Sequence, residues 1–186
     1  MKHKRLRFFS YLVLTISWLF VMRSMTTPLE TTQVLEFEFI GTAQKAIAFL
    51  SALEASGQLE LLTRSIFLDC VFLFLYGATF YFLGAWICSR LPERHVFNNF
   101  RMISISIITA VICDLLENLS MLGMIYYPPQ DAYAYLAFFF AAVKFTLLGL
   151  VLIFFILSGL VLLKTSKEPV SKPASKTQKQ KSDLPA

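Results

Sequence analysis

Charged side chains are scarce in this chain of 186 residues, since Asp, Glu, Lys and Arg together supply only 16% of it. A soluble domain has about 25% charged and about 45–50% apolar residues, whereas apolar residues here reach 56%. They lie in long blocks and include 19 Phe. The composition therefore excludes a soluble globular protein, and it excludes disorder for most of the length.

Histidine and cysteine are also few. His3 and His95 both lie outside the apolar blocks, which excludes histidine-rich membrane di-iron sites and intramembrane His-Glu-x-x-His zinc proteases. Cys70, Cys88 and Cys113 lie inside the blocks and have no metal-binding spacing, so we expect small packing residues. Walker, Gly-x-Ser-x-Gly and Cys-x-x-Cys motifs are absent. We therefore expect no metal and no cofactor, and we favour a non-enzymatic role.

Four apolar stretches are long enough, or nearly so, to cross a hydrocarbon core about 30 Å thick. They are residues 8–22, 65–88, 102–126 and 135–163. The first covers only about 23 Å, so its flanking arginines must snorkel, and the last implies tilt. The sequence predicts an all-α polytopic membrane four-helix bundle over residues 1–163, with an outer loop at 24–64.

The first block has a second interpretation. Residues 1–7 form a basic n-region and residues 8–22 an apolar h-region, which together resemble a secretory signal peptide. The following Arg23, Ser24 and Met25 offer no small-x-small cleavage site, so we favour an uncleaved first helix. A mature N-terminus at residue 24 or later would overturn this interpretation.

Basic residues are distributed unevenly between the two ends of the predicted bundle. Of the 17 basic residues, 13 lie in the N-terminal segment, in the connection between spans two and three, or after Leu163. The other side has Lys45, with Arg23 and Arg64 at the boundary, and most of the acids. Because cytoplasmic segments carry the excess of Lys and Arg, we predict that both termini are cytoplasmic.

The outer loop contains two patterned segments. Residues 34–40 alternate with a period of two, which is typical of an extended stretch. From Ala43, apolar residues recur at helical spacing until Gly57, which is a stop signal for a helix. This second segment is predicted as an amphipathic helix on the membrane surface or capping the bundle. The apolar stripe consists of Ala46, Ile47, Leu50 and Leu53.

The tail at residues 164–186 is rich in Lys, Ser, Pro and Gln, so we expect it to be disordered. Its lysines suit contact with anionic lipid head groups, although a topology determinant is the interpretation that we favour. Six spaced lysines without a fold do not predict nucleic-acid binding.

Ionisable residues within the spans are the main functional signal, because each costs about 2.5–3.5 kcal/mol at the bilayer centre on insertion scales. Asp114, Glu117 and Asn118 are spaced i, i+3, i+4 and share one helix face. On the second span, Tyr76 follows Asp69 by seven residues and lies on the same side. The candidate ligand- or ion-binding residues are Asp69, Tyr76, Asp114, Glu117, Asn118 and Lys144.

Helix geometry predicts which of these residues meet. Glu117 and Lys144 lie about 13 and 14 Å below the outer end of their spans, with Asp69 shallower at about 6 Å. We therefore predict an ion pair between Lys144 and Glu117 or Asp114. The surplus acids are protonated, face water, or hold a cation or a polar ligand head. A purely structural role in joining helices is the alternative, but four ionisable groups exceed what that role requires.

Three stretches carry a resemblance. They are residues 37–46, the pattern Asp69-x-x-Phe72-x-x-x-Tyr76, and the pattern Asp114-x-x-Glu117-Asn118. Over residues 35–125 the chain resembles uncharacterised bacterial four-span integral membrane proteins. The resemblance implies a bacterial inner-membrane setting and no particular activity. It extends neither to the tail nor to Lys144.

Three functions fit these observations. The favoured one is binding or transport of a small solute, ion or proton through the buried acids and Lys144, which for transport by four spans requires a homo-oligomer. The second is an accessory protein whose acids pair with a membrane partner protein. The third is a lipid-modifying enzyme, which we rank lowest because the carboxylates are deep. In each case the lipid bilayer is the surrounding medium.

Overall fold

The computed structural model describes the chain except for residues 1, 93–94, 96–97 and 166–186. The described residues form an all-helical protein, which confirms the predicted fold class. The predicted disordered tail falls almost wholly outside the described residues. In chain order the helices are α1 (Lys2–Thr26), α2 (Thr31–Glu38), α3 (Ala43–Ala55), α4 (Leu59–Cys88), α5 (Phe100–Tyr126) and α6 (Asp131–Thr165).

Four of these helices, α1, α4, α5 and α6, are long and apolar enough to cross a membrane. Three begin several residues before the predicted spans, and α1 also continues to Thr26. Helix α1 therefore extends beyond the predicted span 8–22 at both ends, and helices α2 and α3 lie within the predicted outer loop at 24–64. An apolar stretch in the sequence ends at the first charged residue, but a helix continues until a residue such as Gly57 or Pro28 breaks it. Arg7 and Arg23 both lie within α1, so the snorkelling of these two arginines stays a prediction.

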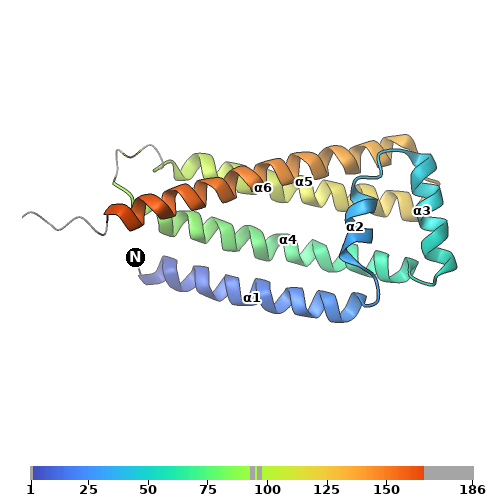
Figure 1. Cartoon of the computed structure of the whole chain (residues 1–186), viewed down its shortest axis with the longest axis horizontal. Helices are drawn as coiled ribbons and strands as arrows, with labels where there is room; N and C mark the ends of the chain where they lie inside the picture. Colours follow the sequence, from blue (N-terminus) through green and yellow to red (C-terminus); the bar gives the residue numbers. More distant parts are fainter. Residues whose placement is uncertain (1, 93–94, 96–97, 166–186) are drawn as a thin grey trace, which may run out of the picture.

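The long helices pack in the order α1, α4, α5, α6. The start of α1 and the end of α6 lie at one end of the molecule, and α3 lies at the other (Figure 1). Two polar contacts fasten α1 to α4: the hydroxyls of Thr15 and Thr79 lie 2.9 Å apart, and Trp18 Nε1 donates to the carbonyl of Leu68 at 3.1 Å. Because α1 has no comparable packing on α5 or α6, α4 holds it in place.

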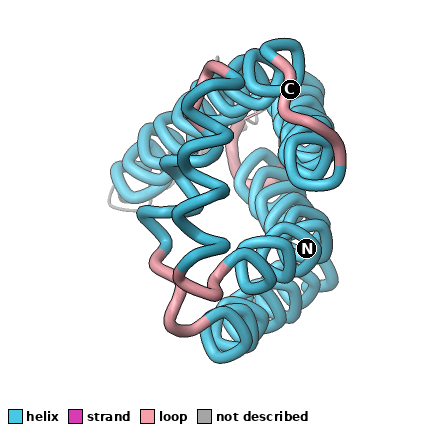
Figure 2. The backbone as a smooth tube through the Cα atoms, turned by 90° about the vertical axis from the view of Figure 1, so that its right-hand side faces the viewer, coloured by secondary structure: helices cyan, strands magenta, loops and turns pink. Residues whose placement is uncertain are grey.

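The predicted amphipathic helix is present as α3, which lies across the end of the long helices (Figure 2). It contacts α4 and α6, so it caps the helices as expected. Asp131 Oδ1, at the start of α6, accepts a hydrogen bond of 2.8 Å from the Ala43 backbone amide. One member of the predicted stripe, Ile47, is exposed. Gly57, the predicted stop, adopts a φ of 72°, a conformation that favours glycine.

The prediction of an extended stretch at residues 34–40 was wrong, because Thr31–Glu38 form helix α2. The buried or half-buried residues in this helix are Gln33, Val34, Phe37 and Glu38, which follow helical rather than alternating spacing. Phe37 is fully buried and stacks on Phe49 of α3. The alternation in the sequence arose because Leu35 and Phe39 are apolar but exposed.

Two apolar cores lie at different levels of the long helices. One is next to α2 and α3 and includes Ile66, Met121 and Ala137. The other is nearer the termini and includes Ile107 and Val151. Along α4, α5 and α6 the predicted site residues lie between these two cores. The polar residues are therefore separated from both ends of the molecule by packed apolar side chains.

Helices α4 and α5 approach closely at one point. A Cβ built on Gly77 of α4 would lie 2.7 Å from Val111 Cγ2 on α5, which is too close for a side chain without movement. The absence of a side chain at Gly77 therefore permits the contact that brings the polar faces of α4 and α5 together.

Candidate functional site

Lys144 is the only cation in a group of buried carboxylates among the described residues. Its Nζ lies 3.0 Å from Asp114 Oδ1 and 2.8 Å from Glu117 Oε2. Both carboxylates come from α5, where their three-residue spacing aims them at α6. Asp114, Glu117 and Lys144 are 4%, 0% and 6% exposed. The ion pair predicted from helix depth is present, and the ammonium contacts both candidate acids instead of one.

Two neutral side chains connect α4 with α5. Tyr76 Oη donates a hydrogen bond of 2.6 Å to Asp114 Oδ2, and Asn118 Nδ2 donates one of 2.7 Å to Asp69 Oδ2. Tyr76 and Asp69 thus share a face of α4, as predicted, but each contacts a different residue of α5. The six predicted site residues thus form two adjacent contact groups, Tyr76, Asp114, Glu117 and Lys144 in one, and Asp69 with Asn118 in the other.

The predicted depth of Asp69 was wrong. Because α4 begins at Leu59 and not at residue 65, Asp69 lies about 15 Å from the start of its helix instead of about 6 Å. This places it level with Asn118, and so with the rest of the site. The first turns of α4 contain charged residues, so the apolar block begins later than the helix does.

A further carboxylate, Glu38, belongs to the site and was missed by the sequence reasoning. It is the last residue of α2, and its Oε2 lies 3.7 Å from Lys144 Nζ. Although it lies in the connection between α1 and α4, Glu38 is only 8% exposed. We call Glu38, Asp69, Asp114 and Glu117, together with Lys144, the carboxylate cluster.

The sequence before α2 explains how Glu38 reaches the cluster. The Glu30 backbone amide donates to Gln33 Oε1 at 2.8 Å, which is one half of a capping box that starts the helix. From this start, helical spacing directs Phe37 into the apolar core and Glu38 toward α5 and α6. The run Glu-Thr-Thr-Gln at 30–33 was the signal that could have revealed this helix.

Burial raises the pKa of the Glu38 carboxyl above its ordinary value. The attraction of Lys144 acts in the opposite direction, and the repulsion of Asp114 adds to the rise. Burial dominates because Glu38 shares its one nearby cation with two closer acids. Four carboxylates around one ammonium carry an excess of three negative charges when all are ionised, which favours the binding of protons or a cation.

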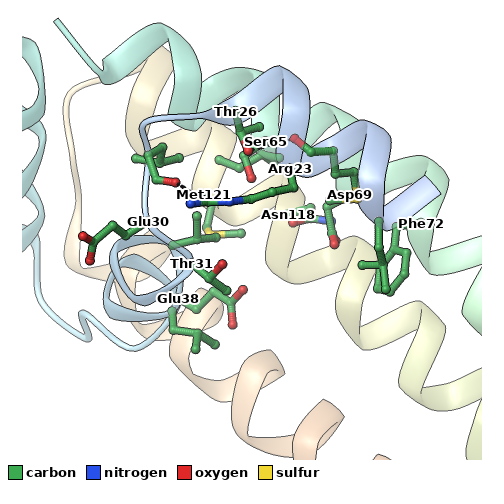
Figure 3. Close-up of a pocket in the computed structure, with 16 residues that line it drawn as sticks. Arg23, Thr26, Glu30, Thr31, Glu38, Ser65, Asp69, Phe72, Asn118 and Met121 are labelled. Carbon is green, nitrogen blue, oxygen red and sulfur yellow. Dashed lines mark hydrogen bonds between the residues drawn. The ribbon is translucent and has the colours of Figure 1, made fainter. Parts of the chain in front are cut away.

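A cavity of about 310 Å³ adjoins the carboxylate cluster. It lies among α1, α2, α4 and α5, and its walls include Arg23, Glu38, Asp69 and Asn118 (Figure 3). Asp114, Glu117 and Lys144 lie behind this wall and do not line the cavity. Asp69 and Glu38 are therefore the two acids through which a molecule in the cavity meets the cluster.

Within the described part of the chain, no group of three or more His, Cys, Asp or Glu residues is arranged to hold a metal ion. Four cluster members are acids, but Lys144 occupies the space between three of them. The chemistry available to the arrangement is thus proton binding, hydrogen bonding and pairing with a cation.

The fold defines an all-helical protein with four helices long and apolar enough to cross a membrane, and with a buried carboxylate cluster between two apolar cores. Comparison of the chain with protein-family models, with curated proteins and with solved structures finds no match.

Proposed function

We propose that this is a multi-pass protein of the bacterial inner membrane that binds and exchanges protons, or a small cation in their place, at its carboxylate cluster. The observation that carries the proposal is the contact of Lys144 with three carboxylates in a site closed at both ends by apolar cores. A structural role requires one balanced pair. The cluster instead has three acids more than bases.

The distribution of charge supports the proposed orientation, with both termini in the cytoplasm. The end of the molecule with the start of α1 and the end of α6 has Arg5, Arg7, Arg90 and Lys164. The end with α3 has mainly acids, among them Glu54 and Asp131. Positive charge is characteristic of the cytoplasmic side.

The orientation is tested with single cysteines introduced after the three native cysteines have been replaced by Ala. Ser51→Cys lies on exposed α3, and Ser89→Cys is exposed at the opposite end. A membrane-impermeant maleimide added to intact cells is expected to label Ser51→Cys and to leave Ser89→Cys unlabelled until the membrane is opened. The reverse pattern would overturn the orientation.

Proton binding is tested by infrared titration of the purified protein in lipid nanodiscs. We expect the absorption of protonated carboxyl groups to change at a pH above the range of an ordinary carboxyl group, because burial raises the pKa of Glu38. The change should shrink in Glu38→Gln and persist in the exposed control Glu36→Gln. A spectrum without any carboxyl group that titrates above the ordinary range would overturn the proposal.

Exchange across the membrane is measured with a pH-sensitive dye inside proteoliposomes. We expect a proton flux that disappears in Asp114→Asn and is unchanged in Glu36→Gln. A titrating cluster without flux would limit the function to binding.

A further inference from the structure

We propose that the cavity beside the carboxylate cluster binds a small organic cation, a protonated amine with an apolar body, whose ammonium group lies against Asp69. This inference rests on the proposed function in that Asp69 and Glu38 belong to the carboxylate cluster. It goes further by assigning a ligand class and a place for the ligand. The cavity volume of about 310 Å³ is at the lower end of the range of about 300–1,000 Å³ for small-molecule sites.

Asp69 provides the first argument, because it is the cluster acid without a cationic partner among the described residues. Lys144 contacts the other three acids, whereas Asp69 receives only the neutral amide of Asn118. It is also half-buried, while Asp114 and Glu117 are closed off. Its position in the cavity wall leaves it facing a space where an ammonium group fits.

Glu38 provides an independent argument from the opposite element, α2. It lines the same cavity, and although the residue is only 8% exposed, its Oε2 has no hydrogen-bond donor. The 3.7 Å to Lys144 Nζ is an ion-pair contact too long for a hydrogen bond. A buried carboxylate oxygen without a donor costs free energy, and the positive charge of an ammonium group in the adjoining cavity stabilises this carboxylate.

The other charges on the cavity wall also favour a cation. Among the described residues Arg23 is the one basic residue of the wall, and its Nη1 donates a hydrogen bond of 2.8 Å to the Leu29 carbonyl. The wall also contains three acids, which are Glu30, Glu38 and Asp69. A monovalent cation reduces this excess, whereas an anion would increase it.

The apolar part of the wall argues for an organic ligand over a metal ion or a proton alone. Leu19, Met22, Ile66 and Phe72 line the cavity between the acids and α1. Phe72 follows Asp69 by three residues and so lies one helix turn away on the same side. An aromatic ring beside a carboxylate suits an ammonium group, which it attracts through its face. Apolar walls provide no favourable contacts for an inorganic ion.

The experiment uses benzylamine, which is a cation at neutral pH, and benzyl alcohol, which has a similar shape without the charge. Binding to the full chain in zwitterionic nanodiscs is measured by calorimetry, with empty nanodiscs to subtract partitioning into lipid. We expect benzylamine to bind and benzyl alcohol to bind at least about tenfold more weakly. Asp69→Asn should weaken the binding of benzylamine by a similar factor, and the exposed control Glu36→Gln should leave this binding unchanged.

A second variant tests the place of binding without altering any charge. Val34 lies on the α2 wall, and Val34→Phe fills part of the cavity. It should abolish benzylamine binding while the infrared titration of the carboxylate cluster persists. Because this variant keeps every acid, it remains informative even if Asp69→Asn fails to fold.

The possible results separate the two proposals. If the cluster titrates but benzylamine does not bind, or binds equally to Val34→Phe, the cavity inference is overturned and the proposed function stands. Equal binding of the amine and the alcohol also overturns it. If benzylamine binds as described but no carboxyl group titrates, the proposed proton exchange is overturned and the cavity inference stands.

Discussion

Glu38 Oε2 lies 3.7 Å from Lys144 Nζ, and this contact joins the short helix α2 to the middle of the long helix α6. The carboxylate cluster is therefore assembled from four helices and not only from the long apolar ones. Glu38 also lines the cavity. Glu38 thus connects the cavity directly to the ammonium group of Lys144.

Replacing the ammonium group is expected to destabilise the fold. Lys144→Met leaves three contacting carboxylates without their cation. Removing one partner of a buried ion pair costs about 3–5 kcal/mol, so we expect a clearly lower free energy of unfolding in detergent. The exposed Lys45→Met should change it by no more than about 0.5 kcal/mol. Equal stability of the two variants would contradict the prediction, and adding Glu117→Gln to Lys144→Met should recover part of the loss.

The hydroxyl of Tyr76 is expected to stabilise the contact between α4 and α5. Tyr76→Phe removes the 2.6 Å hydrogen bond to Asp114, and a hydrogen bond to a charged group contributes about 1.5–3 kcal/mol. Thermal or chemical unfolding should show a loss of that order. Tyr81→Phe is the matched control, because Tyr81 lies on the same helix and is 37% exposed. A loss of the same size in both variants would show that the contact with Asp114 is not responsible.

The stability of the protein should depend on pH through Glu38. Since burial raises the pKa of Glu38 in the fold, the unfolded chain loses this proton first as the pH rises above about 4.5. The folded state then binds more protons than the unfolded state, so Glu38 lowers stability with rising pH until its folded pKa is passed. Unfolding curves of Glu38→Gln should therefore lack this part of the decline, whereas those of Glu36→Gln should keep it. Parallel pH profiles for wild type and Glu38→Gln would refute the assignment.

The close approach at Gly77 predicts a further difference between glycines. Gly77→Ala places a Cβ 2.7 Å from Val111 Cγ2, and overpacking of this kind costs about 1–3 kcal/mol. Gly149→Ala meets nothing within 4 Å, so it should be neutral or stabilising by up to about 1 kcal/mol. Combining Gly77→Ala with Val111→Ala should restore much of the stability. Failure of this rescue would mean that the contact does not limit the packing of α4 on α5.

The sequence was sufficient to predict the helical class and much of the site. The spacing of Asp114, Glu117 and Asn118, together with the helix rise from the ends of α5 and α6, brought Lys144 to the correct level. These predictions succeeded because the three residues lie within long, regular helices. The predicted depth was wrong for Asp69, because Glu60 and Arg64 precede the apolar block and the start of α4 could not be recognised from hydropathy.

Glu38 could not be inferred in the same way. A carboxylate in a polar connection is expected to be exposed, and only tertiary packing of α2 buries this one. The seven-residue pattern around it was too short to distinguish a helix from a strand by period alone. The cavity likewise depends on how α1 and α2 are placed against α4 and α5, which no local pattern specifies.

The position of Lys144 in the last helix has a consequence for biosynthesis. Synthesis proceeds from the N-terminus, so Asp69, Asp114 and Glu117 are made before the lysine that α6 supplies. Until then Asp114 and Glu117 lack the ammonium group that contacts them, and the packing of the first three long helices is incomplete. Chains truncated before α6 should therefore be degraded faster than full-length chains, and replacing Asp114 with Asn should protect the truncated form.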